Sequence, residues 1–438
     1  MTRSASLTRV ETGAREAPRL PLGLADLLAL HLGVALLIVF LMPQVPQGIN
    51  PWVIAVAGAV FVALQLYAAM IFMLRESALE RSLTLQLLIL FLVCVVISSL
   101  KSLHGGYGAR AVIRDIGPMV LLLLALPIAD AATSPRRLRT LKNSLLTGSL
   151  AVALITLVHM GANFPLSRLL APNVAVRRYI IENVEMVFMP LYLGGFAVAV
   201  SQAKYGASRR ARRFALWVLP LMVFAAFLST TRSLYLGMTM ILLAPLVLRP
   251  GLSPIRAWPR LAIVALVCSA GLIVLFQSNS AVFFRQTSLE SPSVQKRFAE
   301  TRATIDAIAN EPLFGRGPGY VLVTIAPEYD LNRRRTYTHN LLSYLLLHYG
   351  IVGVGLFLVL MVRVIGVHLR GLTADSDPDL VILAFASLIG LVGILAYVQF
   401  QAIYKSFSFM AYLAISLGIA GRLEASLPSN GQRKKTEE

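Results

Sequence analysis

A histidine at a polar-to-apolar boundary is the residue in this chain best suited to acid–base chemistry. The segment Thr338-His339-Asn340 precedes an apolar run that reaches Gly350. Thr338 predicts the N-cap and Gly350 the C-cap of a helix of about eleven residues. His339 then falls in the first turn, where the positive helix end keeps the ring neutral, as a general base requires. Ser343, one turn on, could orient the ring. The alternative, a histidine bonded only to backbone, stays open.

Arginines at three places could hold an anionic substrate. The pattern at 294–308 predicts an amphipathic helix with Phe298 and Ile305 on one side. Arg297 and Arg302 are five apart on this helix, so their side chains diverge by about 140°. Arg232 interrupts apolar sequence, which is typical either of a residue facing a polar cavity or of one that reaches the lipid headgroups.

A glycine-rich stretch, Gly315 to Tyr320, follows the predicted helix. Its three glycines and one proline break any regular element, so an irregular turn is predicted. Arg316, Gly317 and Gly319 are candidates for binding phosphate, together with Arg302 and Asn340. The stretch lacks the preceding strand and the Lys-Ser/Thr of a P-loop, so on its own it favours a plain turn.

Other groups that resemble reactive sites have simpler interpretations. Asp375 and Asp377 have the spacing of a metal-binding pair, but they lie in a short loop expected on the opposite side of the membrane. Cys94 and Cys268 lie within apolar runs and indicate neither a disulfide nor a metal site. His348 falls on the far face of the helix that starts near His339. We expect no metal site and no cofactor.

The rest of the chain must position these residues within a membrane. Of the 438 residues, 57% are hydrophobic and only 14% are charged, whereas soluble proteins carry about a quarter charged residues. Apolar runs near 20 residues long predict an all-α, polytopic membrane protein. About twelve spans are predicted, with ends uncertain by about 2–4 residues. They are 22–43, 51–74, 83–100, 116–134, 144–163, 183–202, 214–230, 233–248, 261–278, 351–366, 380–397 and 406–421.

Charge sets the expected orientation. More than half of the lysines and arginines fall on one side if the spans alternate from an inner N-terminus, which places both termini in the cytoplasm. The polar N-terminal tail is interpreted as cytoplasmic and not as a signal peptide. The expected division is an N-terminal bundle (1–278), a long outer segment (279–350) and C-terminal helices with a tail (351–438). The basic outer surface would suit a polyanion such as pyrophosphate, or simply anionic lipid.

The order and spacing of these elements resemble the bacterial O-antigen ligase family and its relatives among the O-antigen polymerases and oligosaccharyltransferases. The resemblance is carried by short motifs in the second half of the chain. They are Ser229-Thr230-Thr231-Arg232-Ser233, Ser293-Val294-x-x-Arg297, Glu311-Pro312-Leu313-Phe314-Gly315-x-Gly317-x-Gly319, and His339-Asn340 followed by Tyr349-Gly350-Ile351-x-Gly353. The first half carries no matching motif.

The resemblance implies a GT-C-like membrane glycosyltransferase of the bacterial inner membrane, with its active site on the periplasmic face. It implies transfer of O-polysaccharide from undecaprenyl pyrophosphate to a sugar hydroxyl of lipid A–core, by a metal-independent, inverting reaction. The family's essential residues would be Arg232, Arg297 and His339. The chemistry agrees with the residues themselves, because His339 could accept the hydroxyl proton and arginines could stabilise the departing phosphates.

Three alternatives remain from the sequence. An O-antigen polymerase, or an enzyme that attaches glycan to protein, would use the same donor. A transporter or flippase would carry ionisable residues within its spans and broken helices, whereas this chain has nearly uncharged spans. A non-catalytic scaffold would not need the histidine and arginines.

Overall fold

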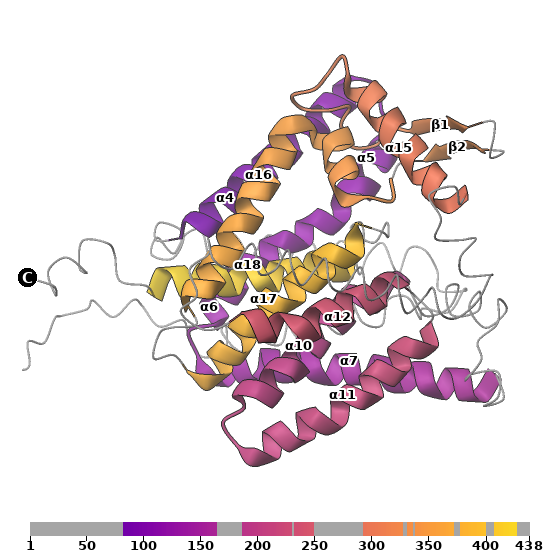
Figure 1. Ribbon diagram of the computed structural model, residues 1–438. Coiled ribbons are helices and arrows are strands. Elements are labelled where there is room, and N and C mark those ends of the chain that lie inside the picture. The colour runs from indigo at the N-terminus through magenta and orange to yellow at the C-terminus, as the bar shows by residue number, and fades with distance from the viewer. Residues whose placement is uncertain are drawn as a thin grey trace, which may run out of the picture.

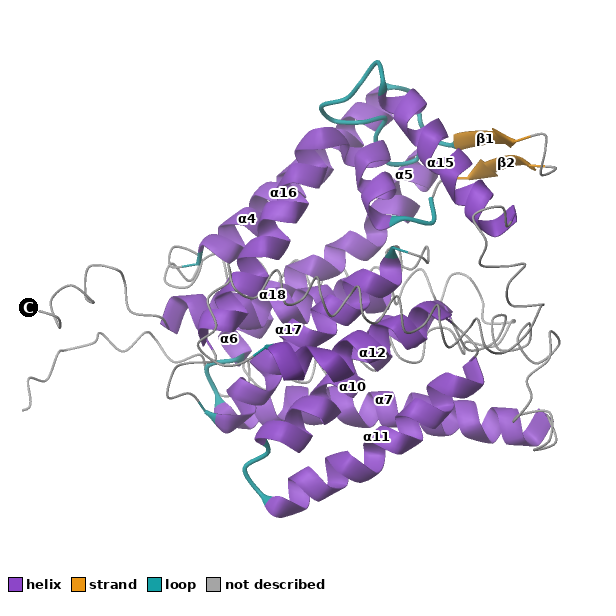
Figure 2. Cartoon of the chain, in the orientation of Figure 1, coloured by secondary structure: helices purple, strands orange, loops and turns teal. Residues whose placement is uncertain are grey.

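The computed structural model is a bundle of helices with one small hairpin (Figures 1 and 2). It describes residues 82–163, 186–229, 232–248, 292–326, 331–335, 338–371, 377–399 and 407–426. The predicted spans 22–43, 51–74 and 261–278 lie outside these residues. The predicted helical class is confirmed for the described chain, except that a two-stranded hairpin is also present.

Helices form most of the described structure. They are α4 (Leu83–His104), α5 (Ala109–Ile116), the 3₁₀ helix η2 (Gly117–Leu124), α6 (Ala125–Ala131), α7 (Pro135–Asn163), α10 (Met186–Tyr205), α11 (Arg209–Ser229), α12 (Arg232–Val247), α16 (Leu341–Gly371), α17 (Pro378–Val398) and α18 (Phe407–Ser426). Among the described residues, five helical stretches are long and apolar enough to cross a membrane: Leu83–His104, Ala109–Asp130, Pro135–Val158, Leu341–Gly371 and Pro378–Val398.

Three helices, α10, α17 and α18, form the centre of the bundle. Their side chains are buried on nearly every face, which requires apolar residues all round the helix. Glycines allow the close packing typical of membrane helices. A Cβ atom at Gly393 of α17 would lie 2.6 Å from the carbonyl oxygen of Gly237 in α12. The α12–α17 contact is therefore made backbone to backbone.

The α12 and α17 helices run in opposite directions. Gly237 meets Gly393, whereas further along α12 the Pro245 carbonyl accepts a hydrogen bond from Lys204, whose ammonium lies 5.2 Å from the Phe385 ring centre. Eight residues forward in α12 thus correspond to eight residues backward in α17. The start of α12 and the end of α17 consequently lie at the same end of the bundle.

At the opposite end of the bundle, the partly buried carboxylate of Glu424 holds three helices together. Ser82 caps α4 through its hydroxyl oxygen, which accepts from Leu85 N–H at 3.3 Å. Glu424 of α18 accepts from Thr84 N–H at 2.9 Å and pairs with Arg363 of α16. These contacts satisfy the free N–H groups at the α4 terminus and join α4, α16 and α18.

A sharp break at Gly350 divides α16. The sequence predicts one helix ending near Gly350 and a separate span from 351, and the structure joins them in one element with φ 64° and ψ −164° at Gly350. The break frees two backbone N–H groups, which donate hydrogen bonds to carbonyls of the loop before β1. Ile351 N–H donates to the Pro312 carbonyl at 2.9 Å, and Val352 N–H donates to the Leu313 carbonyl at 3.1 Å.

The outer segment packs onto the broken end of α16 (Figure 1). It comprises α15 (Pro292–Ile308), the glycine turn, and the antiparallel strands β1 (Leu322–Ala326) and β2 (Leu331–Arg335). The helix predicted at 294–308 and the irregular turn after it are confirmed. The hairpin was not predicted. A small cluster of Ile308, Leu322 and Leu347 joins α15 and β1 to α16.

The apolar side predicted for α15 is not its buried side. Phe298 and Ile305 share a side, as expected, but both are exposed. The buried side instead carries Glu300, Thr304 and Ile308. A polar group can be buried on that face because it finds partners across the contact.

Candidate active site

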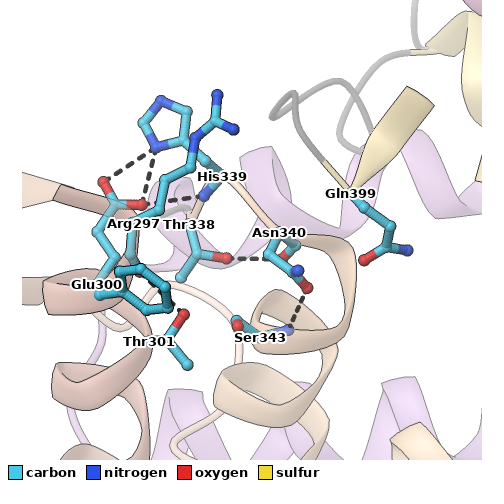
Figure 3. A pocket seen from close by; sticks show the side chains of 9 residues that line it. Arg297, Glu300, Thr301, Thr338, His339, Asn340, Ser343 and Gln399 are labelled. Atoms are coloured by element: carbon cyan, nitrogen blue, oxygen red, sulfur yellow. Dashed lines mark hydrogen bonds and ion pairs between the residues drawn. The ribbon is translucent and has the colours of Figure 1, made fainter. Parts of the chain in front are cut away.

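The predicted histidine and one predicted arginine line a common cavity of about 260 Å³ (Figure 3). It lies between α15, the turn before α16 and the end of α17. The residues around it are Arg297, Phe298, Glu300, Thr301, Thr338, His339, Asn340, Ser343 and Gln399. The structure thus brings together segments about 100 residues apart in sequence.

His339 lies just before the helix and not in its first turn. Asn340 is the N-cap, since its side-chain oxygen accepts from Leu342 N–H at 2.8 Å and Ser343 N–H at 3.1 Å. The Thr338 hydroxyl instead donates to the Asn340 carbonyl at 2.8 Å. Thr338 as the N-cap and His339 in the first turn were therefore wrong, because Asn340 is better placed to reach the first free N–H groups.

A buried carboxylate holds the His339 ring. The ring nitrogen Nδ1 lies 2.8 Å from one Glu300 oxygen and 3.0 Å from the other. His339 backbone N–H also donates to the same carboxylate, at 3.2 Å. Figure 3 shows these contacts converging on Glu300 from the turn before α16. Ser343, which we expected to orient the ring, lines the cavity, but the contacts to the ring come from Glu300.

Arg297 lies one turn before Glu300 on α15 and lines the same cavity. Burial lowers the pKa of its guanidinium from the ordinary value, and the nearby Glu300 charge acts in the opposite direction. Arginine stays charged in spite of such shifts. The cavity therefore contains a fixed cation beside a histidine that is bonded to a carboxylate.

Arg232 begins α12, and its side chain lies outside the described residues. The antiparallel packing described above brings the start of α12 to the end of the bundle where α17 finishes. Gln399 follows directly after α17 and lines the cavity. The backbone of Arg232 is thus positioned at the cavity end of the bundle.

Arg302 and Arg316 lie outside the cavity lining. Arg302 is exposed on α15, as its angular separation from Arg297 predicts. Arg316 donates to the Ala307 carbonyl at 2.5 Å and to Glu311 at 2.7 Å. Its guanidinium also lies 5.8 Å from the Tyr320 ring centre. These contacts fasten the glycine turn to α15.

The turn glycines Gly317 and Gly319 are packed against α4 and α5. Both have positive φ, 84° and 87°, where a side chain would be strained. A Cβ atom at Gly317 would overlap the Ser102 hydroxyl of α4. Gly319 N–H donates to the buried Asp115 carboxylate at 2.8 Å. These observations favour the plain turn, and the phosphate-binding role stays a prediction.

The remaining candidates from the sequence that the structure describes have structural contacts. His348 is buried and its Nδ1 lies 2.8 Å from the Gly317 carbonyl oxygen. Asp377 caps α17 by accepting from Asp379 N–H at 2.8 Å, while Asp375 lies outside the described residues. Cys94 is a buried free thiol, and Cys268 also lies outside the described part of the chain.

Two cavity residues were missed by the sequence analysis. Glu300 is three residues from Arg297, a spacing that places both on neighbouring surfaces of a helix, so this signal could have been found. Gln399 carries no signal, because an isolated glutamine after an apolar span is unremarkable. Only the packing of α17 against the outer end shows it.

The apolar helices indicate a multi-pass membrane protein, and a cavity lined by Arg297, Glu300 and His339 lies at one end of the bundle. Residues 217–358 match the Wzy_C family, described as O-antigen ligase. The family resemblance expected from the motifs is therefore confirmed over this stretch, which contains Arg232, Arg297 and His339. No curated protein matches the chain.

Proposed function

We propose that the chain transfers O-polysaccharide from undecaprenyl pyrophosphate to a sugar hydroxyl of lipid A–core. The observation that carries this proposal is the shared cavity of His339 and Arg297, both within the stretch that matches the O-antigen ligase family. A base and a cation side by side are the two groups that displacement of a pyrophosphate by a hydroxyl needs.

The reaction follows from these roles. The acceptor oxygen attacks the anomeric carbon of the donor sugar while His339 takes the hydroxyl proton. The carbon–oxygen bond to pyrophosphate breaks, and its electron pair leaves with undecaprenyl pyrophosphate. Attack opposite the leaving group inverts the anomeric centre. General-base catalysis of this kind contributes about 10²–10⁴-fold.

Arg297 would stabilise the charge that develops on the departing phosphates, and Arg232 is assigned the same role from the end of α12. Guanidinium groups are suited to this because they are planar, permanently charged and bind phosphate through two parallel hydrogen bonds. Asn340 is the substrate-binding candidate that lines the cavity. Arg302, Arg316, Gly317 and Gly319 have no place in its lining.

The mechanism is proposed to run without a metal ion or cofactor. Within the described residues, no three His, Cys, Asp or Glu side chains are grouped so that they could hold a metal. The two arginines supply the positive charge that a divalent cation would otherwise provide. Insensitivity to EDTA is the corresponding expectation.

The proposal also includes the cellular arrangement. The chain would lie in the bacterial inner membrane with both termini cytoplasmic and the cavity at the periplasmic face. The division into a bundle (1–278), an outer catalytic segment (279–350) and C-terminal helices (351–438) is part of it. Gln399, in the C-terminal part (351–438), would add one residue to the cavity formed by the outer segment (279–350).

A purified transfer assay tests the function. The enzyme is given undecaprenyl-pyrophosphate glycan with two competing acceptors, lipid A–core and a second donor molecule, with and without EDTA. We expect product on lipid A–core alone, unchanged by EDTA. Elongated donor would instead indicate a polymerase, and glycan on an added protein acceptor would indicate a protein ligase. Movement of the lipid-linked glycan across a membrane without transfer would indicate a flippase.

The His339→Ala variant tests the base in the same assay. We expect a loss of about 10²–10⁴-fold in kcat with an unchanged melting temperature. His104→Ala is the matched control, because His104 is an exposed histidine at the end of α4. Normal turnover by His339→Ala would remove the proposed base.

A further inference from the structure

We propose that Glu300 is the positioning residue for His339: it binds Nδ1 and leaves Nε2 as the atom that takes the proton. The catalytic meaning of this inference rests on the proposed function. Glu300 lies outside the motifs that carry the family resemblance, and it acts through the histidine without touching the reacting atoms.

The contacts at Glu300 are those of a carboxylate built into its site. The residue is only 9% exposed, and a charge buried to this extent is costly unless it is paired and hydrogen-bonded. Its oxygens meet the His339 ring at 2.8 and 3.0 Å and the His339 backbone N–H at 3.2 Å. Both carboxylate oxygens of Glu300 thus contact His339, which lies in the turn before α16.

The carboxylate determines which ring nitrogen carries the proton. An ionised carboxylate can only accept hydrogen bonds, so Nδ1 must be the donor in the neutral ring. The lone pair then lies on Nε2, on the opposite edge of the imidazole. A carboxylate behind a histidine serves the same purpose in hydrolytic triads, where it fixes the tautomer and stabilises the imidazolium once it forms.

The charges around the ring also suit the reaction. Arg297 and Glu300, both on α15, are the charged side chains of the cavity lining. The N-cap Asn340, Ser343 of α16 and Gln399 after α17 are all neutral. With a neutral ring, the arginine and the carboxylate offset each other. Proton uptake by His339 adds one positive charge as the leaving pyrophosphate gains one negative charge.

Glu300→Gln is the sharpest test. The amide keeps an oxygen that can accept from the His339 backbone, so the attachment of the turn to α15 is retained. Its NH₂ group can donate to Nδ1, which would place the ring proton on Nε2 and block the base. We expect kcat to fall by about 10²-fold or more, while KM for the donor changes by less than about threefold.

Two further variants separate positioning from structural support. Glu300→Asp keeps the charge and should recover part of the lost kcat. Asp306→Asn removes an exposed carboxylate from the same helix and should behave as wild type. Wild-type kcat in Glu300→Gln would overturn the inference, and so would equal losses in the Gln and Asp variants accompanied by lower melting temperatures.

A second readout does not depend on transfer. Diethyl pyrocarbonate acylates unprotonated imidazole nitrogens, and mass spectrometry reports the rate at His339. At about pH 8, above the range in which histidines ordinarily titrate, modification should be slower in Glu300→Gln than in wild type or Asp306→Asn. Equal rates would contradict the inference. If the wild-type chain transfers no glycan, the proposed function fails while this comparison still tests the Glu300–His339 pairing.

Discussion

Arg297 illustrates what a single side chain contributes to the cavity. It is close enough to Glu300 for the two charges to interact, and it is desolvated enough for burial to lower the pKa of its guanidinium. A cation in such a place binds phosphate more strongly than one in water, because the surrounding dielectric is lower. The neighbouring carboxylate limits the cost of burying it.

Replacing Arg297 by lysine tests this role. The charge is kept, but the planar fork that binds two phosphate oxygens is lost. We expect kcat/KM to fall about 10- to 100-fold, which corresponds to one lost charge-assisted hydrogen bond of about 1.5–3 kcal/mol. Arg302→Lys, on the exposed side of the same helix, is the comparison. Equal losses of kcat/KM in the two variants would show that Arg297 has no specific role in binding phosphate.

At the residue scale, the sequence identified residues of the cavity better than their geometry. His339 and Arg297 were found because their types and order are informative, and the structure places both in one cavity. Glu300 was interpreted only as part of a helix, since its partner lies 39 residues later and no local pattern joins them. The position of His339 before the helix depended on whether Thr338 or Asn340 capped it, and both residue types are good N-caps.

At the scale of elements, the break in α16 links the membrane part of the chain to the outer segment. The loop at 311–315 supplies carbonyls to the N–H groups freed at Gly350. The same loop is fastened to α4, because Lys101 donates to the Gly315 carbonyl at 2.7 Å and pairs with Glu311. The part of α16 before Gly350, which follows the turn that carries His339, therefore ends on a rigid support.

Gly350→Ala should damage this support. A side chain at φ 64° and ψ −164° is in a region that is essentially restricted to glycine and costs about 1–3 kcal/mol. A Cβ atom would also collide with the Leu313 carbonyl. We expect a lower melting temperature and reduced transfer. Gly355→Ala is the control on the same helix, since a Cβ atom there meets nothing within 4 Å, and a similar loss in both would contradict the explanation.

The loop should also respond to pH. The hydrogen bond from Lys101, the largest lowering effect, holds the pKa of Glu311 below its ordinary value. A carboxylate of this kind stabilises the fold above its unfolded pKa of about 4.3, and that stability is lost as the pH falls through the lower folded value. The gap in melting temperature between wild type and Glu311→Gln should therefore narrow from about pH 6 toward pH 3. A constant gap would exclude this explanation.

For the whole molecule, the contact between α12 and α17 determines the position of the helix ends at the cavity. Gly237 and Gly393 let the two backbones meet, and the start of α12 and the end of α17 lie a short distance beyond. Arg232 and Gln399 are each positioned by this packing. No local sequence pattern predicts such a distance, whereas the existence of the apolar helices themselves could be predicted from composition and run length.

Gly393→Ala tests this dependence. The new methyl group would lie 2.6 Å from the Gly237 carbonyl oxygen, so the helices must separate and their ends must shift. We expect a lower melting temperature together with a raised KM for the acceptor. Gly161→Ala in α7, where a Cβ atom has open space, should leave both unchanged. A wild-type KM in Gly393→Ala would show that the cavity is independent of this helix pair.

The distribution of the cavity along the chain has a consequence for its biosynthesis. The outer segment docks on Ser102 and Asp115. Glu300 and His339 belong to that segment, and Gln399 comes after the next-to-last described helix. A ribosome must therefore produce nearly the whole polypeptide before these parts can meet. Nascent chains and C-terminal truncations that end before α17 would be inserted in the membrane with an unfinished cavity, and we expect them to be inactive.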